Sequence, residues 1–369
     1  MLKWIAATAL IAFATALALF ALTPARLLAA HVIFALGVLP LILAAMGFFV
    51  PVLTRSRAPE RAIRLLPVAA LAGGLLVVLH FAAPAALARI DLVAVALLAI
   101  VVLLLGWLWR RARGAIGPAH PGLRWYAAAL GCLMLALTAI ALLPWFGGER
   151  ALLRILHLHF NTLGFVALTA VGTLQVLMPT VAGTPDPDAA RRLRLDLPWA
   201  LTGTLLVALA GIDAKLAWAG ALLWAVVLLR LGGAWWRRYR AVMFAPHHPA
   251  AALAGAWLGL VLLLVAGVLH GEGIVRALDA VPAFVLAFLL PLVTGALSWL
   301  LPAWWRPGSS VAWQTEARAA LARHSALRAV LFLAGGTGVL LGQRAAIILA
   351  VAGLLLFGSR LPRALRAPR

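Results

Sequence analysis

Apolar runs of bilayer-spanning length recur from one end of this chain to the other. A transmembrane helix needs about 17–25 mostly apolar residues. The sequence predicts twelve such helices, at 4–22, 28–52, 65–83, 92–109, 125–145, 153–180, 198–212, 216–234, 250–270, 280–302, 328–342 and 344–358. The chain is 65% hydrophobic and only 11% charged, which excludes a soluble domain. We therefore expect an all-α, polytopic membrane bundle that forms a single integral membrane domain over residues 1–369.

The distribution of lysine and arginine predicts the orientation of this bundle. Of the 31 basic residues, 24 fall at the two termini and in the loops after the even-numbered spans, and seven fall in the other loops. Cytoplasmic loops carry the excess of Lys and Arg. Both termini are therefore expected in the cytoplasm, in a multi-pass protein of the bacterial cytoplasmic (inner) membrane. The +21 charge is explained by these loops, so the expected partner is the lipid bilayer and not nucleic acid.

Five histidines fall at the outer ends of predicted spans in this topology. Ionisable residues inside membrane segments are candidates for functional sites. His157 and His159 open the sixth span, and because they are two residues apart they point about 200° apart around a helix. The five residues are His31, His80, His157, His159 and His270. The other four histidines, His120, His247, His248 and His324, lie in or beside cytoplasmic loops.

Three spans share a pattern that closes on a proline. Each has a small residue seven positions before that proline and an opening position twenty before it. The opening and closing residues are His31 and Pro51, His159 and Pro179, and Pro282 and Pro302. The pattern predicts three pseudo-symmetric four-helix repeat units, approximately 1–110, 111–235 and 236–369.

Imidazole at the outer end of a span can ligate a metal. Neutral histidine is a common ligand for haem iron, copper and zinc. His31, His157 and His159 are the candidate haem-binding residues, and His80 and His270 could complete a second metal site or cap haem propionates. The alternative is that these side chains bond to backbone carbonyls or lipid headgroups. A stripe of threonines below His159 either lines a pathway or bonds within and between helices.

Missing residues exclude several function classes. The single cysteine, Cys132, excludes disulfides and thiolate clusters. The ten acidic residues are expected outside the spans, which argues against proton-coupled transport. No nucleotide-binding loop, nucleophile elbow or HExxH motif is present.

The spans, the repeat, the histidine that opens the second span and the His157-Leu-His159 motif resemble the haem–copper oxidase subunit I superfamily. The nearer resemblance is to its non-oxidase relatives, the NnrS-type membrane haem–copper proteins linked to nitric oxide. The matching residues are His31 to Pro51 and His157 to Pro179. The resemblance implies haem b ligated by His31 and by one or both of His157 and His159, with copper as a second metal. The seventh span lacks the adjacent histidines of the oxidases' copper site, so oxygen reduction is not expected.

These observations favour a haem-binding membrane protein acting in nitric oxide response or electron transfer, with a membrane or periplasmic electron-transfer partner. Two alternatives remain open. One is a non-redox transporter or permease whose histidines and threonine stripe line a substrate path. The other is an assembly helper for a respiratory complex. Whether the chain is an enzyme is left open by the sequence.

Overall fold

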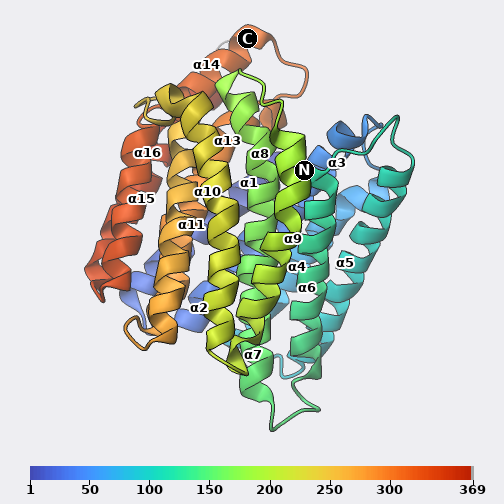
Figure 1. Ribbon diagram of the computed structural model, residues 1–369, viewed down its shortest axis with the longest axis vertical. Coiled ribbons are helices and arrows are strands. Elements are labelled where there is room, and N and C mark those ends of the chain that lie inside the picture. Colours follow the sequence, from blue (N-terminus) through green and yellow to red (C-terminus); the bar gives the residue numbers. More distant parts are fainter. Residues whose placement is uncertain (367–369) are drawn as a thin grey trace. The chain divides into compact units, whose positions relative to one another are not determined.

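The computed structural model describes residues 1–366, and every regular element in that range is a helix (Figure 1). The elements of the first half are α1 (Leu2–Leu22), α2 (Arg26–His31), η1 (Val32–Val38), α3 (Leu39–Thr54), α4 (Arg61–Ala82), α5 (Ile90–Arg113), α6 (Gly122–Leu142), α7 (Arg150–His159), η2 (Phe160–Ala167) and α8 (Leu168–Ala182). Those of the second half are α9 (Ala189–Ala208), η3 (Leu209–Gly211), α10 (Lys215–Met243), α11 (Pro249–Gly271), α12 (Ala277–Ala283), η4 (Phe284–Leu289), α13 (Leu290–Trp305), α14 (Val311–Ala322), α15 (Ser325–Leu340), η5 (Arg344–Ala346), α16 (Ile347–Gly358) and α17 (Leu361–Arg366).

Eleven helices of the described chain are long and apolar enough to cross a membrane. Several combine neighbouring elements, such as α2, η1 and α3, which together form one helix over Arg26–Thr54. The predicted polytopic, all-α membrane bundle is thus confirmed, with eleven such helices instead of twelve. The eleventh predicted span, 328–342, coincides with α15, which is apolar but only 16 residues long.

The chain forms two compact units. One comprises Met1–Ala30, Val176–Asp186 and Leu228–Arg369, and the other comprises His31–Gln175 and Pro187–Val227. We call them the terminal unit and the central unit. In the central unit α5 packs along α6, and in the terminal unit α15 packs along α16. The division of the chain into three repeats stays a prediction.

Three transmembrane helices contain a π-helical segment near their opening end. These segments, η1, η2 and η4, begin at Val32, Phe160 and Phe284. They therefore start 19, 19 and 18 residues before the closing prolines Pro51, Pro179 and Pro302. A π-helical turn is rare and is found frequently at functional sites. Its recurrence at one position of the sequence pattern is a structural counterpart of the repeat.

Proline contributes to two of the three π segments. Pro40 and Pro291 are the second residues of α3 and α13, which follow η1 and η4, and proline cannot donate to the carbonyl four residues earlier in an α-helix. For Pro291 that carbonyl is Ala287, whose oxygen lies against Gly259 of α11. Leu168 of α8 holds the position that corresponds to Pro40 and Pro291, eleven residues before the closing proline, so proline does not explain η2.

Gly259 is needed for this close approach. A Cβ atom at Gly259 would lie 1.8 Å from the Ala287 oxygen, so a side chain there requires the helices to separate. Gly267, also on α11, has nothing within 4 Å of the same hypothetical atom.

We predict that Gly259→Ala destabilises the protein by about 1–3 kcal/mol, the usual cost of overpacking. The measurement is the thermal unfolding midpoint of the purified protein in detergent. Gly267→Ala is the matched control and should leave the midpoint unchanged or raise it, because alanine is the better helix former. Equal losses in both variants would contradict the proposed role of the contact.

Candidate functional site

Four of the five predicted site histidines lie in the central unit: His31, His80, His157 and His159. His31 lies near the start of its helix, His80 near the end of the next one, and the other two near the start of Arg150–Ala182. Successive antiparallel helices place such positions at the same end of a bundle. The fifth, His270, belongs to the terminal unit.

His31 and His159 occupy the same structural position. Each is the last residue of an α-helix, α2 or α7, and each directly precedes a π segment. Both side chains are half-buried. The third repeat has Pro282 inside α12, two residues before η4. The equivalence of His31 and His159 that the sequence pattern indicates therefore extends to the local backbone.

An aromatic cluster holds His31. Its ring stacks on Phe81 with the ring centroids 3.9 Å apart and the planes inclined by 20°. His80 meets the same phenyl ring edge-on at 5.1 Å. The two histidines of this cluster come from α2 and α4, whose contact is made by Phe81. This phenyl ring fixes the orientation of His31 on one face.

The ring of His157 is oriented by hydrogen bonds. Its Nδ1 lies 3.0 Å from the Ala136 carbonyl oxygen of α6. Asn161 Nδ2 donates to the His157 carbonyl at 2.8 Å and lies 3.3 Å from the ring nitrogen Nδ1 and 3.4 Å from Nε2. A carbonyl can only accept, so Nδ1 carries the proton and Nε2 bears the lone pair.

His80 and His270 show the same ring arrangement at the ends of α4 and α11. Nδ1 of His80 donates to the Leu87 carbonyl at 2.7 Å, and Nδ1 of His270 donates to the Val275 carbonyl at 2.9 Å. These are the backbone contacts that the sequence left open as the alternative to metal binding. They are also the contacts that orient metal-ligating histidines, because Nε2 then presents its lone pair. Their role as metal ligands stays a prediction.

The predicted site histidines do not gather into a multi-ligand metal site in the described part of the chain. No group of three or more His, Cys, Asp or Glu side chains that could hold a metal ion occurs in residues 1–366. A copper or zinc ion held by three protein ligands does not fit this arrangement. Haem iron is held by one or two axial side chains, and single imidazoles suffice.

The threonine stripe bonds mainly to its own helix. The hydroxyls of Thr162, Thr173 and Thr180 each donate to the carbonyl four residues earlier, at 2.7–2.8 Å. Thr173 also bonds the Tyr126 hydroxyl at 3.0 Å. This is the packing role of threonine in membrane helices. Thr169 is the exception in the stripe, because its buried hydroxyl has no hydrogen-bond partner among residues 1–366.

One buried polar cluster was missed by the sequence reasoning. Asp196 was expected outside the spans, but α9 begins at Ala189 and carries Asp196 inside the helix, fully buried. Arg192 lies one turn earlier and donates from Nε to Gln175 Oε1 at 2.8 Å. Gln175 of α8 is itself fully buried. The four-residue spacing of Arg192 and Asp196 is the signal that could have revealed the cluster.

Three histidines in or beside the predicted cytoplasmic loops accept hydrogen bonds at Nδ1. The backbone N–H of Gly122 donates to Nδ1 of His120 at 3.1 Å, and that of Ala250 donates to Nδ1 of His248 at 3.2 Å. The N–H of His324 donates to Nδ1 of His247 at 3.0 Å. Each residue therefore has a structural role at the start of a helix, as N-cap residues do.

Comparison with known proteins gives a local similarity. No protein-family model matches the chain. A stretch of 64 residues, 17% of this chain, is 38% identical to "Cytochrome c oxidase subunit 1" of Thermus thermophilus and covers 56% of that sequence. The chain thus spans about half the length of the curated relative it matches. The chain is a membrane protein with a partial likeness to a haem–copper oxidase subunit, and the nearer likeness to the NnrS family is not confirmed.

We predict that acidification destabilises the helix starts at His120 and His248. Burial lowers the pKa of both imidazoles below the ordinary value of 6.5. A lowered folded-state pKa means that the stabilisation is complete above pH 6.5 and is lost as the pH falls through the folded pKa. Protonation of Nδ1 removes the hydrogen-bond acceptor. We therefore expect the thermal unfolding midpoint to decrease as the pH is lowered from 7.5 to about 5.

His248→Asn provides the control for this prediction. Asparagine also caps helices but does not titrate in this range, so the variant should show a shallower pH dependence than the wild type. If the unfolding midpoint of the double variant His120→Asn/His248→Asn depends on pH as that of the wild type does, other groups cause the acid sensitivity.

Proposed function

We propose that this chain is a haem-binding integral membrane protein of the haem–copper oxidase-like class, with His31 and His159 as axial ligands of haem b. The observation that carries the proposal is the shared position of these two histidines. Each ends an α-helix immediately before a π segment, and both belong to the central unit. The partial similarity to a cytochrome c oxidase subunit supports the same class.

The surrounding residues suit a bound, planar, largely apolar group. The phenyl ring of Phe81 stacks on the His31 imidazole. Phe160 and Phe165 belong to η2, which directly follows His159, and both side chains are buried. Such side chains exclude water, and a low-dielectric environment tunes the electronic properties of haem. His157, with Nδ1 held by Ala136, offers Nε2 as an alternative ligand to His159.

Haem, when bound, would supply one-electron redox chemistry or reversible binding of a diatomic gas. The chain would contribute the imidazoles, their orientation and the exclusion of water. We infer a role in electron transfer or in the response to nitric oxide, in the bacterial inner membrane with both termini cytoplasmic and with an electron-transfer partner on the outer side. The basic-residue asymmetry supports this orientation.

The test is an absorption spectrum of the full-length protein purified from haem-replete membranes. We expect a Soret band that shifts on reduction and is lost or strongly weakened in His31→Ala and in His159→Ala. His247→Ala is the matched control, because His247 is an exposed histidine whose Nδ1 bonds backbone, and it should keep the band. A folded but colourless wild-type preparation would disprove the proposal.

A further inference from the structure

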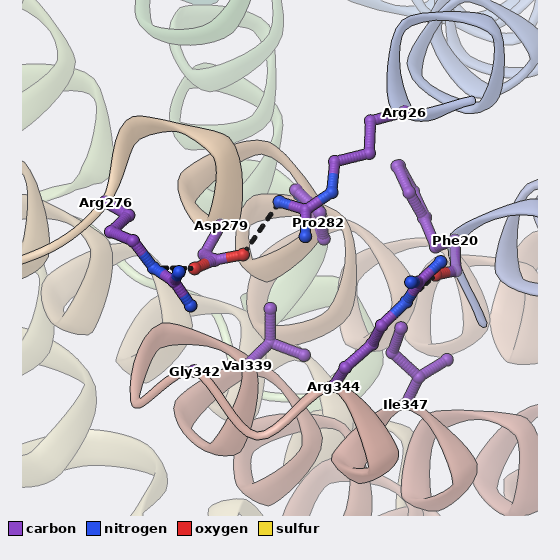
Figure 2. A pocket seen from close by; sticks show the side chains of 9 residues that line it. All are labelled: Phe20, Arg26, Arg276, Asp279, Pro282, Val339, Gly342, Arg344 and Ile347. Atoms are coloured by element: carbon purple, nitrogen blue, oxygen red, sulfur yellow. Dashed lines mark hydrogen bonds and ion pairs between the residues drawn. The ribbon is translucent and has the colours of Figure 1, made fainter. Parts of the chain in front are cut away.

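Three arginines from separate loops converge on one pocket of the terminal unit (Figure 2). They are Arg26 at the start of α2, Arg276 just before α12 and Arg344 in η5. Only seven lysines and arginines of the chain fall in the sparsely charged, predicted outer loops, and these are three of them. The positive-inside rule explains basic residues in cytoplasmic loops, but it does not explain why three arginines of the predicted outer loops lie together.

One carboxylate lies among the arginines. Asp279 Oδ1 accepts from Arg26 Nη1 at 2.9 Å, and Asp279 Oδ2 lies 3.3 Å from Arg276 Nε (Figure 2). The Asp279 side chain is 9% exposed, whereas that of Arg276 is 75% exposed, so the anionic group is enclosed and the cationic side faces outward. Among the nine lining residues, three guanidinium groups oppose a single carboxylate, which leaves a net charge of +2.

Arg344 is held in place by backbone groups and not by an acid. Its Nε donates to the Phe20 carbonyl at 2.8 Å, and its Nη2 donates to the Thr23 carbonyl. These carbonyls end α1, where the last four have no partner within the helix. These two acceptors are neutral carbonyl oxygens, so they do not compensate the positive charge of Arg344 at the pocket.

The rest of the lining is apolar. Phe20, Val339 and Ile347 come from α1, α15 and α16, and Pro282 comes from α12. A cationic surface beside apolar side chains at the end of transmembrane helices matches a phospholipid, in which a phosphate adjoins hydrocarbon. Basic pockets between transmembrane helices bind anionic lipid headgroups, and arginine suits phosphate because of its planar, multidentate donors.

We propose that this pocket binds a phosphate group, presented by the headgroup of an anionic glycerophospholipid. The two charges in excess of Asp279 neutralise the phosphate, and the apolar lining contacts the adjoining glycerol and acyl carbons. The site does not depend on haem, and its test is independent of the function proposed above.

The test is native mass spectrometry of the full-length protein in detergent, titrated with phosphatidylglycerol, with phosphatidylcholine and with inorganic phosphate. We expect saturable binding of one phosphatidylglycerol. Arg344→Gln or Arg276→Gln should weaken it on the order of tenfold, the effect of losing one charged hydrogen-bonding partner, and the double variant should weaken it further. Arg276→Gln is the safer single variant for folding, because its side chain is mostly exposed.

Arg154→Gln is the matched control, since it removes an exposed arginine from the same predicted face outside the pocket. It should bind phosphatidylglycerol like the wild type. Inorganic phosphate that binds as tightly as the lipid, with the same dependence on the arginines, would assign the phosphate site to a soluble ligand. Equal lipid binding in every variant, or equally tight phosphatidylcholine binding, would overturn the proposal.

Discussion

Within hydrocarbon, every backbone N–H and C=O group needs a partner inside the protein, and most features of this structure follow from that constraint. Every regular element of residues 1–366 is accordingly a helix. The same constraint also accounts for the hydroxyls of Thr162 and Thr173, which bond their own helix. The open carbonyls at the end of α1 are met by Arg344 from a segment more than 300 residues away. These polar side chains hydrogen-bond to backbone carbonyls. A side chain with a second polar atom can make such a bond and still bind a ligand through the other atom.

Histidine has two ring nitrogens, so one can bond the backbone while the other stays available. In this structure Nδ1 donates in one group of histidines and accepts in another. His80, His157 and His270 donate from Nδ1 to a carbonyl, which leaves the lone pair on Nε2 for a ligand. His120, His247 and His248 accept at Nδ1 from a backbone N–H, which makes them parts of loops and helix starts. The first group comprises three of the five outer histidines of the predicted topology, and the second comprises three of the four cytoplasmic ones. Which of the outer histidines ligate a metal stays a prediction.

The π segments connect the repeat to the candidate site. In an α-helix that is wound regularly, His31 and His159 would be ordinary positions near a helix start. The π turns that follow them change the direction of the next side chains, and the close contacts of small residues, such as Gly74 against the Ala35 oxygen, hold those turns. The third repeat keeps the π segment η4 without a histidine at its opening position. The π segment and the opening histidine are therefore separable features of the pattern, and only its first two copies combine them.

The sequence by itself determined the membrane class, the approximate limits of most spans, the sorting of the basic residues and the placement of five histidines at span ends. These depend on hydrophobicity and chain direction, which are local and additive along the chain. It also indicated the proline-closed pattern but not the π segments, since Leu168 carries no local signal for η2. Only the tertiary structure decided that Asp196 is buried and that the arginines meet, as when Arg26 and Arg276 reach Asp279. Hydrogen-bond partners and converging charges depend on packing between segments far apart in the chain, and that information is absent from any one stretch of sequence.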